Sequence, residues 1–128
     1  MNITYEKTKF NILAWSLEDT ISLFWVSSFI EEFYLLEDFD LIKRTTLEIC
    51  QKLLEEGVVI AGNLLDDNSF IPWNKNIFEI ISEIKLKWNS LDRNFQPQEI
   101  VWLEVTKKGE KEFEYLKTIP EVAKVDPF

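Results

Sequence analysis

The sequence predicts an α+β fold, in which a cluster of three or four helices packs on a small antiparallel sheet. Residues 77–91 carry the clearest helical signal, because apolar side chains recur there at offsets of 3, 4, 7, 11 and 14 from Ile77. Two short apolar runs rich in β-branched residues, 58–61 and 100–105, predict strands. The length of 128 residues and the apolar content of 46% indicate a single domain, 1–128, with a full core.

The first third of the chain is predicted to form an extended lead-in followed by one long helix. Residues 1–15 hold only short apolar stretches, so we expect a lead-in strand or an extended segment there. Over residues 17–36 apolar side chains fall on nearly all sides, which is typical of a central helix with two packing neighbours. Ser16 followed by Asp19 resembles a capping box at the start of this helix.

A second helix is expected over residues 39–56. Thr45 and Glu48 form a possible internal capping box, so two helices that meet near Arg44 are an alternative. Gly57 is well placed to end the segment, because glycine adopts the left-handed conformation that often follows a helix.

The C-terminal half is predicted to add two more helices and a tail. Asn76 is expected to cap the helix over 77–91, and residues 94–97 are expected to form a loop. Thr106 is expected to cap a final helix that ends near residue 117. Residues 118–128 contain two prolines, so an extended tail is expected.

Two segments resemble the winged-helix superfamily. Residues 46–60, T-L-E-I-C-Q-K-L-L-E-E-G-V-V-I, resemble a helix that ends in Leu-x-x-x-Gly and runs into the first wing strand. Residues 102–110, W-L-E-V-T-K-K-G-E, resemble a returning wing strand that leads through Leu-x-x-Thr-x-x-Gly into a final helix. The resemblance implies that strands 58–61 and 101–105 are antiparallel neighbours. The helical segment 74–91 is then inserted between these two strands, where a typical winged helix has only a short hairpin.

The helix in the position of a DNA-recognition helix carries the wrong charge for DNA. Glu48, Glu55 and Glu56 stand against Lys52 alone in this segment. These carboxylates repel phosphate, so the resemblance implies the fold without DNA binding.

Composition excludes several classes of function. The chain has no histidine and one cysteine, which excludes histidine-based triads, histidine-ligated metals and a disulfide framework. With 23 acidic and 14 basic residues the net charge is −9, so nucleic acid is not an expected partner. We find no pattern typical of an enzyme and expect no cofactor and no metal.

The location expected from the sequence is the cytoplasm. The N-terminus lacks a charged-then-apolar signal pattern. The longest uncharged run in the most apolar segment is eleven residues, 20–30, whereas a membrane span needs about 20. We therefore expect no membrane partner, and we interpret Cys50 as a buried, reduced thiol.

Acidic residues are concentrated near the N-terminus, where residues 1–40 hold eight of them and only two lysines. Such asymmetry steers a basic partner toward the chain. We predict a first partner-binding patch at the carboxylates Glu31, Glu32, Glu37, Asp38 and Asp40. A second patch is expected at Asp66 and Asp67, with Trp73 as an exposed apolar anchor. The alternatives are a solvated helix end for the first patch and an ordinary turn for the second.

In general character the chain resembles bacterial immunity proteins, which are compact and often acidic. This resemblance implies a binding protein, a monomer or weak dimer, that blocks a basic toxin domain such as a nuclease. A winged-helix transcription regulator that binds duplex DNA is one alternative. An adaptor or structural module in a larger complex is another.

Overall fold

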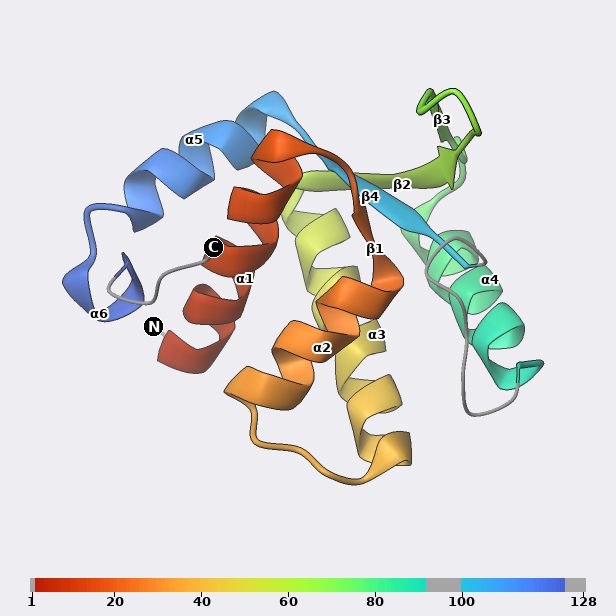
Figure 1. The fold of residues 1–128 in the computed structure, drawn as a ribbon, viewed down its shortest axis with the longest axis horizontal. Helices are drawn as coiled ribbons and strands as arrows, with labels where there is room; N and C mark the ends of the chain where they lie inside the picture. The colour runs from red at the N-terminus through yellow and green to blue at the C-terminus, as the bar shows by residue number, and fades with distance from the viewer. Residues whose placement is uncertain (1, 92–99, 124–128) are drawn as a thin grey trace.

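The computed structural model describes residues 2–91 and 100–123, and it has the predicted α+β fold (Figure 1). These residues form six helices, rather than three or four, and one antiparallel sheet of four strands. In chain order the elements are α1 (Ile3–Glu18), β1 (Ile21–Ser22), α2 (Leu23–Phe33), α3 (Phe39–Glu56), β2 (Val59–Leu64), β3 (Phe70–Pro72), α4 (Ile77–Asn89), β4 (Trp102–Val105), α5 (Lys107–Leu116) and α6 (Pro120–Ala123).

The sheet has the strand order β1-β4-β2-β3. Its central pair confirms that the segments 58–61 and 101–105 are antiparallel neighbours, with Val59 opposite Val105 and Ala61 opposite Leu103. The helix α4 lies between these strands in sequence, as expected. Strand β3, which the sequence analysis did not predict, extends the sheet beyond β2 through a tight hairpin.

The N-terminal segment is helical, so the predicted extended lead-in over 1–15 is wrong. Helix α1 is capped by the Asn2 side chain, which accepts a hydrogen bond from the Tyr5 backbone N–H. Figure 1 shows α1 flanked by α5 and α6 on one side and by α2 on the other, and all three helices contact it. Such a central helix is buried on most sides, which hides its helical period in the sequence.

The predicted long helix over 17–36 is also wrong, because strand β1 interrupts it. Ser16 lies inside α1 and donates its hydroxyl to the Ile12 carbonyl, so it does not begin a helix. Asp19 is extended, with φ of −165°, and ends α1. Ile21 then pairs with Leu103 of β4, and α2 begins at Leu23.

Helix α3 confirms the predicted helix over 39–56 and runs without a break near Arg44. Asp38 caps its start, and Gly57 ends it in the left-handed conformation with φ of 74°. Asn76 caps the start of α4, as predicted, and the Glu79 side chain completes a capping box there.

The two segments that resemble a winged helix meet at one junction. Thr106 caps α5 by accepting a hydrogen bond from the Gly109 backbone N–H, as predicted for its cap. Its hydroxyl donates to the Gly57 carbonyl at 2.6 Å, and its backbone N–H donates to the Val58 carbonyl at 3.0 Å. A Cβ on Gly109 would lie only 2.2 Å from the Val58 carbonyl oxygen, so this close approach requires glycine.

The predicted extended tail over 118–128 is wrong for its first part, because Pro120–Ala123 form the short helix α6. Val122 is fully buried and belongs to the core, which explains why this segment folds back. Residues 124–128 and the predicted loop at 94–97 lie outside the described residues. Among the helices that the structure describes, none is long and apolar enough to cross a membrane.

Candidate functional site

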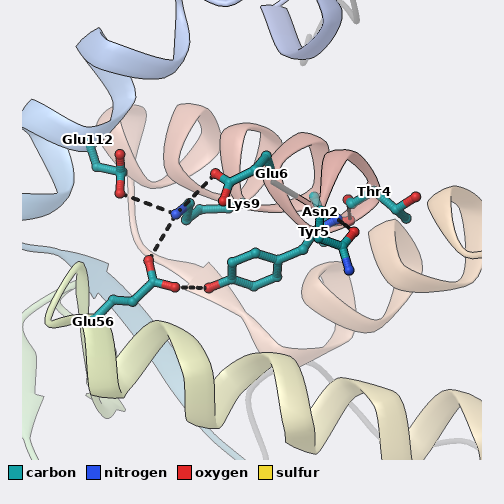
Figure 2. Close-up of polar contacts among 8 residues, drawn as sticks. Asn2, Thr4, Tyr5, Glu6, Lys9, Glu56 and Glu112 are labelled. Carbon is teal, nitrogen blue, oxygen red and sulfur yellow. Dashed lines mark hydrogen bonds and ion pairs between the residues drawn. The ribbon is translucent and has the colours of Figure 1, made fainter.

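The most prominent buried polar group is the amine of Lys9, which is 3% exposed (Figure 2). Its Nζ lies 2.9 Å from a carboxylate oxygen of Glu56 and 3.2 Å from those of Glu6 and Glu112. The Tyr5 hydroxyl donates to the other oxygen of Glu56. Each of the three ammonium donors of Lys9 has a carboxylate, so the cluster is satisfied and joins α1, α3 and α5.

The cluster shifts the titration of both of its proton donors. Burial lowers the pKa of Lys9, but the hydrogen bond and the charge of Glu56, with those of Glu6, outweigh it and raise the pKa. Burial raises the pKa of Tyr5, and its hydrogen bond to Glu56 raises it further. Both groups therefore stay protonated, which suits a structural clamp.

Cys50 lies in the core, as the sequence predicts. Its thiol is fully buried, and burial raises its pKa to about 12. A nucleophilic cysteine needs a lowered pKa and access to solvent, and Cys50 has neither property.

The five carboxylates of the first predicted patch are all exposed, and we call this group the acidic loop: Glu31, Glu32, Glu37, Asp38 and Asp40. It spans the end of α2, the connection to α3 and the first turn of α3. Asp38 and Asp40 have a local reason to be acidic, because the start of a helix favours negative charge. Glu31 and Glu32 lie in the last turn of α2, where the helix dipole disfavours them. Local structure does not explain these two charges.

Exposed apolar side chains accompany the acidic loop. Leu35 is 86% exposed, Phe39 is 42% exposed and Leu41 is 38% exposed. Leu35 also has a positive φ of 54°, which is rare for a residue with a branched side chain. The loop therefore presents apolar side chains to solvent in the same segment as five exposed carboxylates.

A ladder of aromatic rings leads along α2 toward the acidic loop. Trp15 of α1 stacks on Trp25 at a centroid distance of 5.5 Å and lies 6.0 Å from Phe29. Phe29 in turn lies 6.4 Å from Phe33. Trp25 is 43% exposed, so the ladder reaches the surface. We call the ladder and the acidic loop together the α2 surface.

The aromatic part of this surface is not predicted by the sequence. Apolar residues on all sides of a segment are typical of a central helix, so the pattern over 17–36 predicts that its aromatic residues are buried. The available signal was the high aromatic content of this segment, which core packing alone does not require.

A pocket of about 450 Å³ lies at the start of α2, where α1, β1, α2 and β4 meet. Three tryptophans, two carboxylates and two smaller residues line it: Trp15, Trp25, Trp102, Glu18, Asp19, Thr20 and Ile21. The tryptophans come from three different elements, so only the tertiary fold brings them together.

The second predicted patch does not join the first. Asp66 and Asp67 are exposed in the β2–β3 turn, at the opposite end of the molecule from the acidic loop in Figure 1. The hydroxyl and backbone N–H of Ser69 hydrogen-bond to Asp67 and lower its pKa, so Asp67 stabilises the turn. This geometry favours the alternative of an ordinary turn.

The exposure predicted for Trp73 is not found. Trp73 is half-buried against the core, and its indole N–H donates to the Asn63 side chain at 3.0 Å. The amines of Lys75 and Lys87 lie 5.6 Å and 4.9 Å from the centre of its ring. These cation–π contacts cover the ring within the chain itself.

Within residues 2–91 and 100–123, no group of three or more cysteine, aspartate or glutamate side chains is arranged to hold a metal ion. No protein-family model matches the sequence, and no similar chain is found among curated proteins or among solved structures.

Proposed function

We propose that this chain is a non-enzymatic binding protein that captures a basic protein through its α2 surface. In this proposal the partner is a toxin domain, which the chain neutralises in the cytoplasm as an immunity protein that is a monomer or weak dimer. The observation that carries the proposal is the acidic loop, in which five exposed carboxylates share one segment with the exposed side chain of Leu35.

Several residues of the acidic loop are unfavourable for the stability of the isolated chain, and this supports a role in binding. Glu31 and Glu32 oppose the dipole of α2, and Leu35 combines exposure with a strained backbone conformation. None of these features stabilises the isolated chain. A basic partner relieves the charge repulsion and covers the leucine, so the same features contribute to the stability of a complex.

The charges and the apolar groups have different tasks in such a complex. Carboxylates at the surface raise the association rate for a positively charged partner, and salt screens this effect. Leu35, Phe39 and the rings along α2 are buried on binding and slow dissociation.

The winged-helix resemblance is supported by the connectivity of the sheet. Strand β1 follows the first helix and pairs with β4, the strand that returns after the insertion. Helix α3 then precedes β2 in the position of a recognition helix. A transcription regulator is therefore the second candidate function. An adaptor module, the remaining alternative, would use the same α2 surface as the proposed toxin-binding protein.

Two observations favour protein binding over DNA binding. Helix α4 packs along α3, with Lys43 hydrogen-bonded to Asn89 at one end and Glu55 beside Ile77 at the other. The inserted helix thus covers part of the helix that a winged helix inserts into DNA. Glu48 and Glu55 are exposed on α3 and repel phosphate.

The proposal is tested by reversing charges that the α2 surface carries. The variant Glu31→Lys/Glu32→Lys/Glu37→Lys places two cations in the last turn of α2, where the helix dipole favours them, and a third at an exposed position in the connection to α3, so we expect it to fold. The control Glu55→Lys/Asp66→Lys/Glu114→Lys makes the same change in net charge at exposed positions elsewhere.

The wild-type chain is first used to capture basic proteins from native extract, and binding is then measured by stopped-flow. We expect the α2 variant to associate about tenfold more slowly than wild type at low salt, and the control to change far less. The difference should shrink as salt rises. Equal rates for the two variants, or recovery of duplex DNA in place of a basic protein, would reject the proposal.

A further inference from the structure

The pocket at the start of α2 combines aromatic faces with negative charge. Trp15, Trp25 and Trp102 line it together with the carboxylates of Glu18 and Asp19. No lysine or arginine lines it among the described residues, and neither carboxylate has an ion pair there. The pocket therefore carries negative charge that this part of the chain does not neutralise.

The two carboxylates occupy an electrostatically unfavourable place. Glu18 is the last residue of α1, and Asp19 ends the helix. The C-terminus of a helix carries partial negative charge, so carboxylates there weaken α1 and increase the attraction for a cation. Asp19 accepts a hydrogen bond from the Thr20 backbone N–H, which holds its carboxylate at the rim.

Two of the residues that line the pocket, Thr20 and Trp102, carry a polar atom without a hydrogen-bond partner among the described residues. The Thr20 hydroxyl oxygen and the Trp102 indole nitrogen are buried and have no hydrogen-bond partner among these residues. The Thr20 hydroxyl oxygen can accept a hydrogen bond from an N–H group, and the Trp102 indole N–H can donate one to a carbonyl.

We propose that this pocket binds the guanidinium group of an arginine side chain on the basic partner protein. The inference rests on the proposed function and deepens it, since it names the residue type that the α2 surface recognises. A guanidinium is planar and weakly hydrated, so it stacks on indole rings at little cost. Its parallel N–H groups match carboxylates better than the compact ammonium of lysine.

Size and position agree with this occupant. A volume of about 450 Å³ lies within the range of about 300–1,000 Å³ that is typical of ligand pockets, and it has room for the whole arginine side chain. The pocket lies at one end of α2, and the acidic loop lies at the other end. A partner that lies along α2 thus contacts both.

The pocket is tested directly with N-acetyl-arginine methylamide, a probe that does not depend on the identity of the partner. The indole N–H signals of the five tryptophans are followed by NMR in the full chain. We expect the probe to shift the signals of Trp15, Trp25 and Trp102 and to leave those of Trp73 and Trp88 in place. The neutral citrulline analogue, which has nearly the same shape, should bind far more weakly.

Two variants separate charge from ring stacking. Glu18→Gln/Asp19→Asn keeps the shape of the pocket, and we expect it to weaken binding of the probe by about fivefold or more. Trp25→Ala should abolish the shifts. Asp66→Asn and Trp73→Phe are the matched controls outside the pocket, and both should bind the probe as wild type does.

The outcomes distinguish this inference from the proposed function. Equal binding of the arginine and citrulline probes, or shifts centred on Trp73 and Trp88, would overturn the pocket proposal. Those results would leave the stopped-flow test of the acidic loop unaffected. If the arginine probe binds as expected while the α2 charge reversal leaves the association rate unchanged, the pocket stands and the proposed function fails.

Discussion

Lys9 of α1 and Glu56 of α3 form an ion pair of 2.9 Å, although they are 47 residues apart in the chain. Glu112 of α5 binds the same amine from a third helix. The clamp joins the end of α3 to α1 close to the junction of Gly57 with Thr106. The clamp therefore links α1, α3 and α5, the helices that contact the central strands β2 and β4.

Removing the amine is expected to destabilise the fold. Lys9→Met leaves Glu6, Glu56 and Glu112 close together without a cation, and we expect a loss of about 2–3 kcal/mol in the free energy of unfolding. The loss is smaller than for a fully buried pair, because water reaches these carboxylates. Urea denaturation measures it. Lys111→Met, at an exposed lysine of α5, is the control and should change the stability little.

Alkaline pH is expected to weaken the same cluster. The pKa values of Lys9 and Tyr5 are raised in the folded chain above their ordinary values of 10.5 and 10.0. Above about pH 10 the folded state thus binds more protons than the unfolded state, so stability that is present below this pH is lost as pH rises.

Thermal unfolding between about pH 8 and 11 checks this dependence. Tyr5→Phe removes one of the two titrating groups and should make the alkaline decline shallower. A decline in Tyr5→Phe as steep as that of the wild-type chain would contradict the assignment.

Gly109 is expected to tolerate substitution less well than Gly57, although Gly57 has the unusual backbone conformation. In Gly109→Ala the new methyl group meets the Val58 carbonyl oxygen at 2.2 Å, so α5 must move away from β2. We expect a cost of about 2–3 kcal/mol for this variant and about 1 kcal/mol for Gly57→Ala. Chemical denaturation of both variants measures these costs. A larger loss of stability in Gly57→Ala than in Gly109→Ala would contradict the prediction and show that α5 shifts easily.

Duplex DNA is expected not to bind. The chain has a net charge of −9, and α4 packs along the helix that a winged helix would use for recognition. Fluorescence anisotropy with a labelled duplex should show no change at micromolar protein in about 150 mM salt. Binding that weakens steeply with added salt would instead favour the transcription regulator, with Lys107 and Lys108 as phosphate contacts.

Features with local causes were predictable from the sequence. Asp38, Asn76 and Thr106 accept hydrogen bonds from backbone groups two or three residues away, so the helices they begin can be identified in isolation. The end of α3 at Gly57 follows in the same way. Even the pairing of β2 with β4 could be inferred, because the motif around Thr106 and Gly109 accompanies such a pairing in the winged-helix family.

The negative charge of the acidic loop was predictable from the sequence, but the exposure of its apolar side chains was not. Counting residues showed the excess of carboxylates near the N-terminus. The exposure of Leu35 depends on a turn with a positive φ between two helices, and this turn has no glycine to mark it. Trp73 is the opposite case. Its place beside Pro72 predicts an exposed ring, but the amines of Lys75 and Lys87 lie over this ring in the structure.

The sequence by itself therefore determined the starts of α3, α4 and α5, the end of α3, the central strand pair and the sign of the surface charge, because each depends on neighbours or on composition. Only the tertiary structure decided that α1 is a helix and that β1 interrupts the next one. A helix buried on all sides has no visible period, and the partner of Ile21 is Leu103, far away in the chain. The same long-range packing brings Trp15, Trp25 and Trp102 around one pocket, since three separate elements must meet before it exists.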